Sequence, residues 1–332
     1  MKNHYPLHEL NFKNASAEEQ LRTRKVFEDL KKRAHDGKTF LEREKDFFCT
    51  CLKLSQWNDG HIHEFEICND YEFKELYLTY FHNNLEGPFF KVHKTQIIEV
   101  SPDEQIKDFA YLMKVADEWS KQIEIENHKN PILQEIGFET RRDLKSLSQK
   151  FTGLNRIFRK QKDDYKLRKD KIILQSKFIY LLVKSVIENN DNKDFEIPFS
   201  NETIEFTIYS LVHIVSRHYA EPIKQNEDKT YHYENFFPTE LHIDLKNILL
   251  EIDKLNLIDI NKTDNIIFKF KGVHYRLYIQ KRFKQVKGIK GNIQFFRIQT
   301  FYPLYSQEDF EMLQKEYNEN KIMDELSVFI HK

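Results

Sequence analysis

A chain of 332 residues exceeds the usual size of one domain, so its length predicts two domains. Charged residues make up 32% of the chain with nearly balanced signs and apolar residues 40%, which excludes a wholly disordered protein. No apolar run reaches the roughly 18 residues of a membrane span, and the N-terminus lacks an apolar signal core. We therefore expect a cytoplasmic protein with no membrane partner.

The N-terminal third shows mainly helical periodicity. Helices are predicted over residues 15–34, 40–54 and 71–82, and Ser101 followed by proline starts a further helix. Residues 61–68 alternate polar and apolar side chains after an Asn-Asp-Gly turn, which is typical of a half-buried strand. This region is therefore expected to be mostly helical.

A group of potential metal ligands falls within this region: Cys49, Cys51, His61, His63 and Cys68. Their spacing matches no common zinc finger, in which two residues usually separate paired cysteines. The thiols could instead pack in reduced form on apolar faces while the histidines point outward. We expect no metal and no other cofactor, and a zinc site is the alternative.

The middle of the chain carries an apolar repeat of seven residues. Its members are Leu144, Phe151, Phe158, Tyr165, Ile172, Ile179 and Val186. The repeat predicts one long helix with coiled-coil character, about 75 Å long for roughly 50 residues, which Gly153 could bend. Such a stripe must be covered by another helix. Residues 101–127 are the expected internal partner, which favours a monomer over a dimer.

The same helix carries twelve basic and four acidic residues between Arg141 and Lys171. A charge run of this kind is usually the solvated face of a helix in a bundle. The alternative is an extended arm that binds RNA or DNA through its charge.

A polar segment without periodicity, residues 189–194, predicts a linker. We place the domain boundary there, with a mostly helical region over residues 1–190 and a second domain over residues 200–332. The elements expected in the second domain are a helix entered at residues 197–203, a helix over 239–255, strands around Asn265, His274 and Asn292, and a final helix capped by Ser306.

Residues 262–300 are strongly basic, with ten Lys or Arg and a single acid, Asp264. In a chain whose net charge is −1, this concentration predicts a polyanionic partner, and nucleic acid is the first to consider. The expected nucleic-acid-binding residues are Lys281, Arg282, Lys284, Lys287 and Arg297.

Two histidines lie on the helix predicted to precede this basic hairpin. On a helical wheel that starts at Ile204, an apolar stripe falls within roughly 60° and continues to Tyr219. His218 lies within the arc of that stripe and His213 lies opposite it. His218 is therefore expected to face the surface on which the helix packs, either as a core imidazole or as a general acid or base.

Strand alternation predicts which side chains of the hairpin share a face. It separates Thr300 from Arg297 on the last strand and groups His274, Arg276 and Tyr278 on the strand before it. A guanidinium and a hydroxyl presented by adjacent strands are suited to holding a phosphate. The same composition is also compatible with a solvated sheet face.

Three motifs in this order resemble a known class of enzymes: His-Ile-Val-Ser-Arg-His-Tyr on a helix, Phe-Lys-Phe-Lys-Gly-Val-His-Tyr-Arg-Leu, and Arg-Ile-Gln-Thr-Phe-Tyr-Pro. The segment from about Thr203 to Pro303 is similar to the metal-independent ribonucleases of the barnase, EndoU, colicin and RelE class, especially their phage and toxin branches. The resemblance implies that His218 is a general acid or base, with His213 as a second candidate. It also implies that Arg276 and Arg297 stabilise phosphate charge and that Thr300 donates a hydrogen bond to phosphate. No residue obviously matches the catalytic glutamate of some branches.

We therefore expect an α+β protein in which a small antiparallel sheet, packed with helices, follows a mostly helical region. The expected function is an endoribonuclease that needs no metal and acts as a toxin or anti-phage effector, with RNA as substrate and a protein inhibitor or antitoxin as a further partner. The helical region would restrain, position or deliver the nuclease. Two alternatives are a nucleic-acid-binding protein without catalysis and a helical interaction protein.

Overall fold

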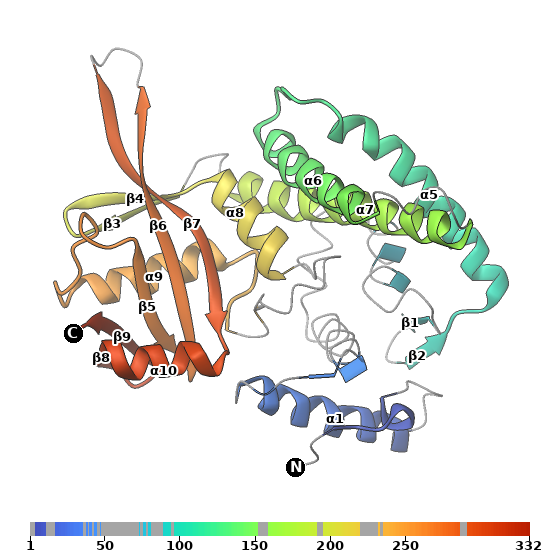
Figure 1. Cartoon of the computed structure of the whole chain (residues 1–332), viewed down its shortest axis with the longest axis horizontal. Helices are drawn as coiled ribbons and strands as arrows, with labels where there is room; N and C mark the ends of the chain where they lie inside the picture. The colour runs from blue at the N-terminus through green and yellow to red at the C-terminus, as the bar shows by residue number, and fades with distance from the viewer. Residues whose placement is uncertain are drawn as a thin grey trace. The chain divides into compact units, whose positions relative to one another are not determined.

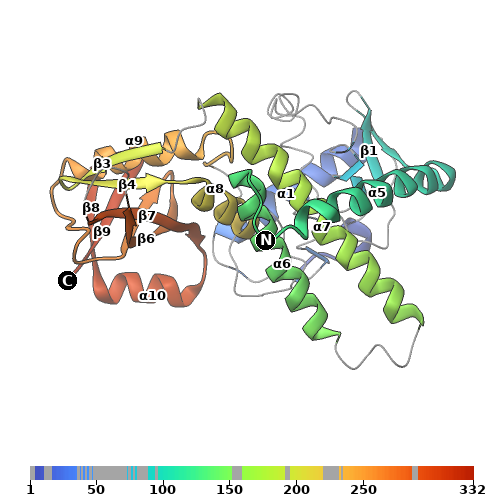
Figure 2. The same cartoon turned by 90° about the horizontal axis from the view of Figure 1, so that it is seen from above.

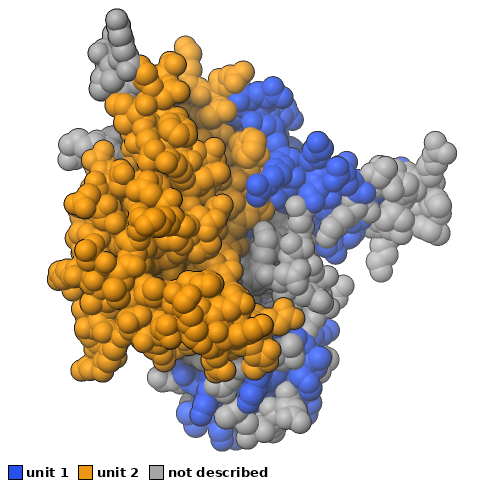
Figure 3. Space-filling model, turned by 60° about the vertical axis from the view of Figure 1, so that its left-hand side comes forward, with its two compact units in different colours: residues 1–126, 140–178 blue, residues 127–139, 179–332 orange. Residues whose placement is uncertain are grey.

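The computed structural model is an α+β protein (Figure 1). It forms two compact units, one of residues 1–126 and 140–178 and the other of residues 127–139 and 179–332 (Figure 3). The residues that it describes are 4–10, 17–35, 38, 40–41, 43–44, 47, 73, 76–77, 79–80, 89–93, 96–151, 159–190, 195–219, 232, 235–285 and 291–332. We call the two compact units unit 1 and unit 2 in that order. The chain passes from unit 1 to unit 2 after residue 178, before the predicted linker at residues 189–194, and residues 127–139 also belong to unit 2.

Unit 1 is mainly helical, as its periodicity predicts. Its described elements are η1 (Leu7–Glu9), α1 (Ala17–His35), β1 (Phe90–His93), β2 (Gln96–Glu99), α5 (Pro102–Ile123) and parts of α6 (Pro131–Lys150) and α7 (Arg159–Asn189). α5 begins at the predicted residue, because the Ser101 hydroxyl accepts a hydrogen bond from the backbone N–H of Glu104 and Pro102 follows the cap. Within the described residues, no helix combines the length and the apolar character needed to cross a membrane.

The predicted single long helix is wrong, because α6 and α7 are separate helices. They form a hairpin (Figure 2) whose connection includes Phe151 and the segment 152–158, which lies outside the described residues. The rings of Phe151 and Tyr165 meet edge to face at 5.3 Å. Fourteen residues apart on one straight helix, they would be separated by about 21 Å. Two members of the repeat therefore contact each other across the hairpin.

α7 is buried around much of its circumference rather than along one stripe. Ile172, Ile173 and Leu174 are consecutive and all buried, which is typical of a helix inside a core. α5 is one of its neighbours, since the Trp119 indole N–H donates to the Ser176 hydroxyl at 2.9 Å. The segment predicted to cover this helix within the chain does contact it.

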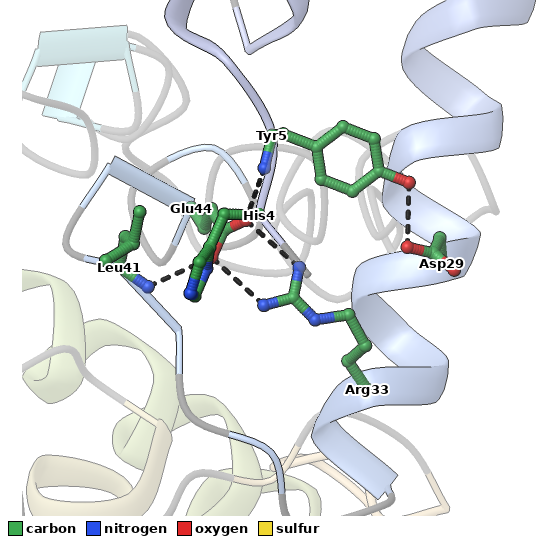
Figure 4. Close-up of polar contacts among 6 residues, drawn as sticks. All are labelled: His4, Tyr5, Asp29, Arg33, Leu41 and Glu44. Atoms are coloured by element: carbon green, nitrogen blue, oxygen red, sulfur yellow. Dashed lines mark hydrogen bonds and ion pairs between the residues drawn. The ribbon is translucent and has the colours of Figure 1, made fainter. Parts of the chain in front are cut away.

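A buried carboxylate holds three segments of unit 1 together (Figure 4). Glu44 is fully buried and accepts two hydrogen bonds from the Arg33 guanidinium, at 3.0 and 3.1 Å. The backbone N–H groups of Tyr5 and Leu41 donate to it at 2.8 and 3.0 Å, and His4 Nδ1 lies 3.2 Å away. Burial alone would raise the pKa of Glu44, but these hydrogen bonds outweigh it and lower the pKa to about 2. The cluster joins the N-terminal segment, α1 and residues 41–44.

Unit 2 is built on a seven-stranded sheet with the strand order β3-β4-β7-β6-β5-β9-β8. The strands are β3 (Phe195–Phe199), β4 (Glu202–Phe206), β5 (Asn265–Phe270), β6 (Val273–Gln285), β7 (Asn292–Leu304), β8 (Tyr317–Met323) and β9 (Leu326–His331). β4 and β7 are parallel, so the sheet is mixed and the prediction of an antiparallel sheet is corrected at this pair. The strands expected around Asn265, His274 and Asn292 are confirmed.

The segment predicted as a helix entry at residues 197–203 is instead the β3–β4 hairpin. Its two-residue turn places Ser200 and Asn201 at φ 53° and 61°, as a hairpin turn of the primed type requires. Ile204 therefore lies on a strand and does not belong to the helical stripe. The helix begins only after Thr207, whose side chain and that of Ser210 cap each other's backbone N–H.

Helices cover both faces of the sheet. α9 (Leu241–Asp253) and α10 (Gln307–Glu316) lie on opposite sides of it (Figure 2). α10 packs its Leu313 against Ile267 and Leu304, and the Ser306 cap predicted for it is confirmed. α8 (Ile208–Ile214) continues into a short π-helix, η3 (Val215–Tyr219), and this segment runs beside β7.

Candidate active site

A β-bulge decides which side chains of β7 share a face. Tyr278 pairs with Thr300, but the next residue, Ile279, pairs with Ile298, so Gln299 is the extra residue. One extra residue reverses the alternation of all residues beyond it. Arg297 and Thr300 therefore lie on the same face, and the prediction that separates them is wrong.

The face of the sheet on which Arg297 and Thr300 lie also carries the even-numbered residues of β6, and we call it the even face of β6. These residues are His274, Arg276, Tyr278, Gln280 and Arg282. All are half-buried, whereas the alternating residues Val273, Tyr275, Leu277 and Ile279 are buried in the core. The polar face is therefore a continuous strip along β6, and β7 adds Arg297, Thr300 and Tyr302 to it.

His218 contacts this face through two side chains of β7. Its Nε2 atom lies 2.9 Å from the Thr300 hydroxyl, and its ring stacks on Tyr302 with centroids 5.1 Å apart. Arg276 Nη1 donates to the Tyr302 hydroxyl at 3.4 Å. The structure thus brings His218, Thr300 and Arg276 into one chain of contacts, with Tyr302 as the link that the sequence analysis missed.

The π-helical turn follows a helix that is anchored to β7. The Ser210 hydroxyl donates to the backbone carbonyl of Ile298 at 2.6 Å and anchors α8 to β7. His218 lies in the wider turn that follows, and its own carbonyl accepts from His232 N at 2.9 Å. Such turns are rare and often occur at functional sites.

Arg276 lies between the sheet and α10. Its Nη2 is 3.9 Å from Asp309 and 3.5 Å from the Met312 sulfur. Its Nε is buried and has no hydrogen-bond partner among the described residues. The guanidinium therefore retains hydrogen-bonding capacity for an oxyanion.

His213, the second histidine, is held by a carboxylate from α6. Glu139 lies 3.1 Å from His213 Nδ1 and also pairs with Arg217, whose Nε donates to it at 3.1 Å and whose Nη2 makes a shorter contact. Glu139 and Arg217 are both buried. A carboxylate at Nδ1 favours the tautomer that leaves Nε2 as a base. The spacing of His213 and Arg217 on one helical face could have suggested an acidic partner, but not which one.

Arg297 is partly buried between aromatic and polar groups. Its guanidinium lies over the Tyr209 ring at 4.0 Å, and His213 stacks on Tyr209 at 5.7 Å. With the side-chain oxygen of Gln299 turned toward Arg297, that oxygen accepts from Nε and Nη2 at 3.0 and 3.1 Å. Burial lowers the pKa of Arg297, and the positive charge of Arg282 lowers it further.

Glu135 of α6 interacts electrostatically with Arg297. Burial raises the pKa of Glu135, Arg297 acts in the opposite direction, and Glu139 adds to the increase. The first half of α6 therefore brings two acids to this part of unit 2.

His232 supports the site from the core. Its Nε2 contacts the carbonyl of Phe301 at 3.0 Å, and its ring stacks on Tyr219 and Tyr275. Burial lowers the pKa of His232 to about 3, although the hydrogen bond opposes this change. The imidazole is therefore neutral at pH 7, which suits a structural donor.

The predicted nucleic-acid-binding residues fall on different faces of one ribbon. Beyond the pair Lys281–Phe296, β6 and β7 extend past the other strands (Figure 1). Arg282 and Lys284 lie on the even face, and Lys281 lies on the opposite one. Lys284 pairs with Glu205 and lies 4.9 Å over the Phe295 ring. Lys287 is outside the described residues.

The alternative zinc ligands Cys49, Cys51, His61, His63 and Cys68 all lie outside the described residues. In the part of the chain that the structure describes, no group of three or more His, Cys, Asp or Glu side chains could hold a metal ion.

Comparison of the chain with protein-family models, with curated proteins and with solved structures found no match.

Proposed function

We propose that unit 2 is a metal-independent endoribonuclease. The observation that carries this proposal is the contact chain from His218 through Thr300 and Tyr302 to Arg276. It combines an imidazole that can transfer a proton, hydroxyls that can form hydrogen bonds to a phosphate and a guanidinium that can stabilise its charge. The resemblance to ribonucleases supports the same residues and adds the proposal of a toxin or anti-phage role.

In the proposed reaction, a base removes the proton of the ribose 2′-hydroxyl, and the oxygen attacks the adjacent phosphorus. The bond from phosphorus to the 5′-oxygen breaks, and an acid protonates that leaving oxygen. Imidazole can serve in either role, because its unperturbed pKa is about 6.5. His218 is the first candidate, and His213, oriented by Glu139, is the candidate for the second proton transfer.

The phosphate would lie against Thr300 and Arg276. A guanidinium stabilises the charge that develops on phosphorus oxygens in the transition state, and the Thr300 hydroxyl can donate to one of them. The buried Nε of Arg276, which has no partner among the described residues, supports an anion at this place.

The test is cleavage of labelled RNA in the presence of EDTA. His218→Ala is expected to reduce the rate by a factor of about 100 to 10,000, because a general acid or base is lost. His331→Ala is the matched control, since His331 is exposed at the end of β9. Cleavage by the His218 variant at the parent rate, or no cleavage of any RNA by the parent, would refute the nuclease.

A second candidate is a nucleic-acid-binding protein without catalysis. The ribbon at the ends of β6 and β7 favours it, because it carries Lys281, Arg282 and Lys284. Salt-dependent RNA binding by a parent protein that cleaves nothing would support this candidate.

A further inference from the structure

Arg282 differs from the other basic side chains on the even face. Three of them have an acidic neighbour. These pairs are Arg276 with Asp309, Arg297 with Glu135, and Lys284 with Glu205. Within the described residues, Arg282 forms no ion pair, and its Nε is buried without a hydrogen-bond partner. A buried donor in this state calls for a ligand or an ordered water.

Arg282 interacts electrostatically with a second arginine on this face, Arg297. Gln280 pairs with Arg297 and Arg282 with Phe295, so the two arginines are diagonal neighbours on adjacent strands. Arg282 also acts on the pKa of Arg297, which it lowers. Two guanidiniums placed side by side repel each other, and an anion between them would remove that repulsion and satisfy the buried donor.

We propose that Arg282 and Arg297 bind a second, uncleaved phosphate of single-stranded RNA, and that Tyr278, which is paired with Thr300, stacks a base beside the cleavage site. This inference rests on the proposed function, because the second phosphate is defined by its position relative to the cleavage site at His218, Thr300 and Arg276.

The spacing of Arg276 and Arg282 along β6 sets how many nucleotides are needed to reach both residues. Arg276 and Arg282 are six positions apart on β6, which is about 20 Å along a strand. At 3.4 Å per stacked nucleotide this corresponds to about six nucleotides, and to fewer in an extended strand. Tyr278 lies between Arg276 and Arg282 along β6, half-buried and paired with Thr300. An aromatic ring between cationic groups is typical of sites for single strands, whose bases are available for stacking.

The decisive experiment compares two variants that each remove one positive charge from the same ribbon. Arg282→Ala changes the even face, and Lys281→Ala changes the opposite face one residue away. Both are made in the His218→Ala background, so that binding of a labelled single-stranded RNA of about eight nucleotides is measured without cleavage. Arg282→Ala is expected to weaken binding about ten-fold or more, because a charged hydrogen bond is lost, and Lys281→Ala to weaken it several-fold less.

Tyr278 is tested in the same background. Tyr278→Ala is expected to weaken binding by roughly ten-fold, whereas Tyr278→Phe, which keeps the ring, should bind as the parent does. Equal losses for the alanine and phenylalanine variants would refute the stacking role.

Cleavage gives an independent readout. With His218 intact, the ratio of kcat/KM for the longer RNA to kcat/KM for a dinucleotide should fall about ten-fold in Arg282→Ala, because only the longer RNA reaches the second site. Equal weakening of binding by Arg282→Ala and Lys281→Ala, or tighter binding of duplex than of single-stranded RNA, would refute the inference. If the parent cleaves neither RNA, the proposed function fails, and the binding comparison still decides the second phosphate site.

Discussion

Buried polar groups are satisfied differently in the Glu44 cluster of unit 1 and in the candidate site of unit 2. In unit 1, Glu44 accepts hydrogen bonds from Arg33 and from the backbone of Tyr5 and Leu41, and it lies against His4 as well. In unit 2, Arg276 and Arg282 each keep a buried Nε that has no partner among the described residues. A carboxylate surrounded by donors stabilises the fold, whereas a guanidinium with unused donors can bind a ligand.

The largest effect is expected at Glu44. Glu44→Gln removes the buried charge that pairs with the Arg33 guanidinium, and breaking a buried ion pair typically costs about 3–5 kcal/mol in the free energy of unfolding. Hydrogen exchange followed by mass spectrometry should show faster exchange in α1. Glu18→Gln, at an exposed position of the same helix, is the control. Unchanged exchange in the Glu44 variant would contradict a structural role for this cluster.

The next effect concerns Arg276. Arg276→Ala is expected to lower kcat for RNA cleavage about 100- to 1,000-fold, which is the usual cost of losing a donor to transition-state charge. Arg276→Lys keeps the charge and should recover part of the rate. Thermal unfolding is the second readout, because Arg276 also contacts Tyr302 and Asp309. A large loss of stability with an unchanged kcat would show that Arg276, like Glu44, has a structural role.

Acid should destabilise the two units over different pH ranges. In the folded protein, burial keeps His232 neutral by lowering its pKa to about 3. In the unfolded chain, the same group becomes protonated below its ordinary pKa of about 6.5. The stability that the neutral His232 contributes is therefore complete above about pH 6.5 and is lost as the pH falls below it. At pH 5 the loss from this group is about 2 kcal/mol. The contribution of Glu44, whose pKa is lowered to about 2, persists down to about pH 4.5 and is lost below it.

Hydrogen exchange measured between pH 7 and pH 5 checks this difference. The core of unit 2 around Tyr275 and Phe301 should exchange faster at pH 5, with a smaller change in α1. His232→Gln keeps a side-chain donor but does not titrate, so it should reduce the pH dependence in unit 2. The same pH dependence in this variant and in the parent would show that other groups cause it.

The smallest effect is expected at Thr300. Thr300→Ala removes one hydroxyl, which is worth on the order of 1 kcal/mol, or roughly a five-fold lower rate of cleavage. Thr300→Ser keeps the hydroxyl and should cleave at nearly the parent rate. A loss in Thr300→Ala as large as in His218→Ala would mean that Thr300 takes part in proton transfer.

Several features of this protein could be predicted from local sequence. The caps at Ser101 and Ser306 depend on residues within one helical turn, and both helices start where they are predicted to. β6 and β7 were also predicted, because alternation of side chains operates within a single strand. The α+β class follows from these local signals. His218 is buried as expected, but the helical wheel that selected it starts at Ile204, which lies on β4, and treats the π-helical turn as an α-helix.

Tertiary structure alone decided the composition of the candidate site. The bulge at Gln299 depends on the register with β6, and it moves Arg297 to the face of Thr300. Glu139 reaches His213 from a helix 74 residues earlier in the chain, and no local pattern selects that acid among the many available. The heptad repeat is compatible with one helix or with a hairpin, and the contact of Phe151 with Tyr165 shows that the chain forms the hairpin. Local patterns are short in range, whereas register and pairing depend on which distant segments bury each other's surfaces.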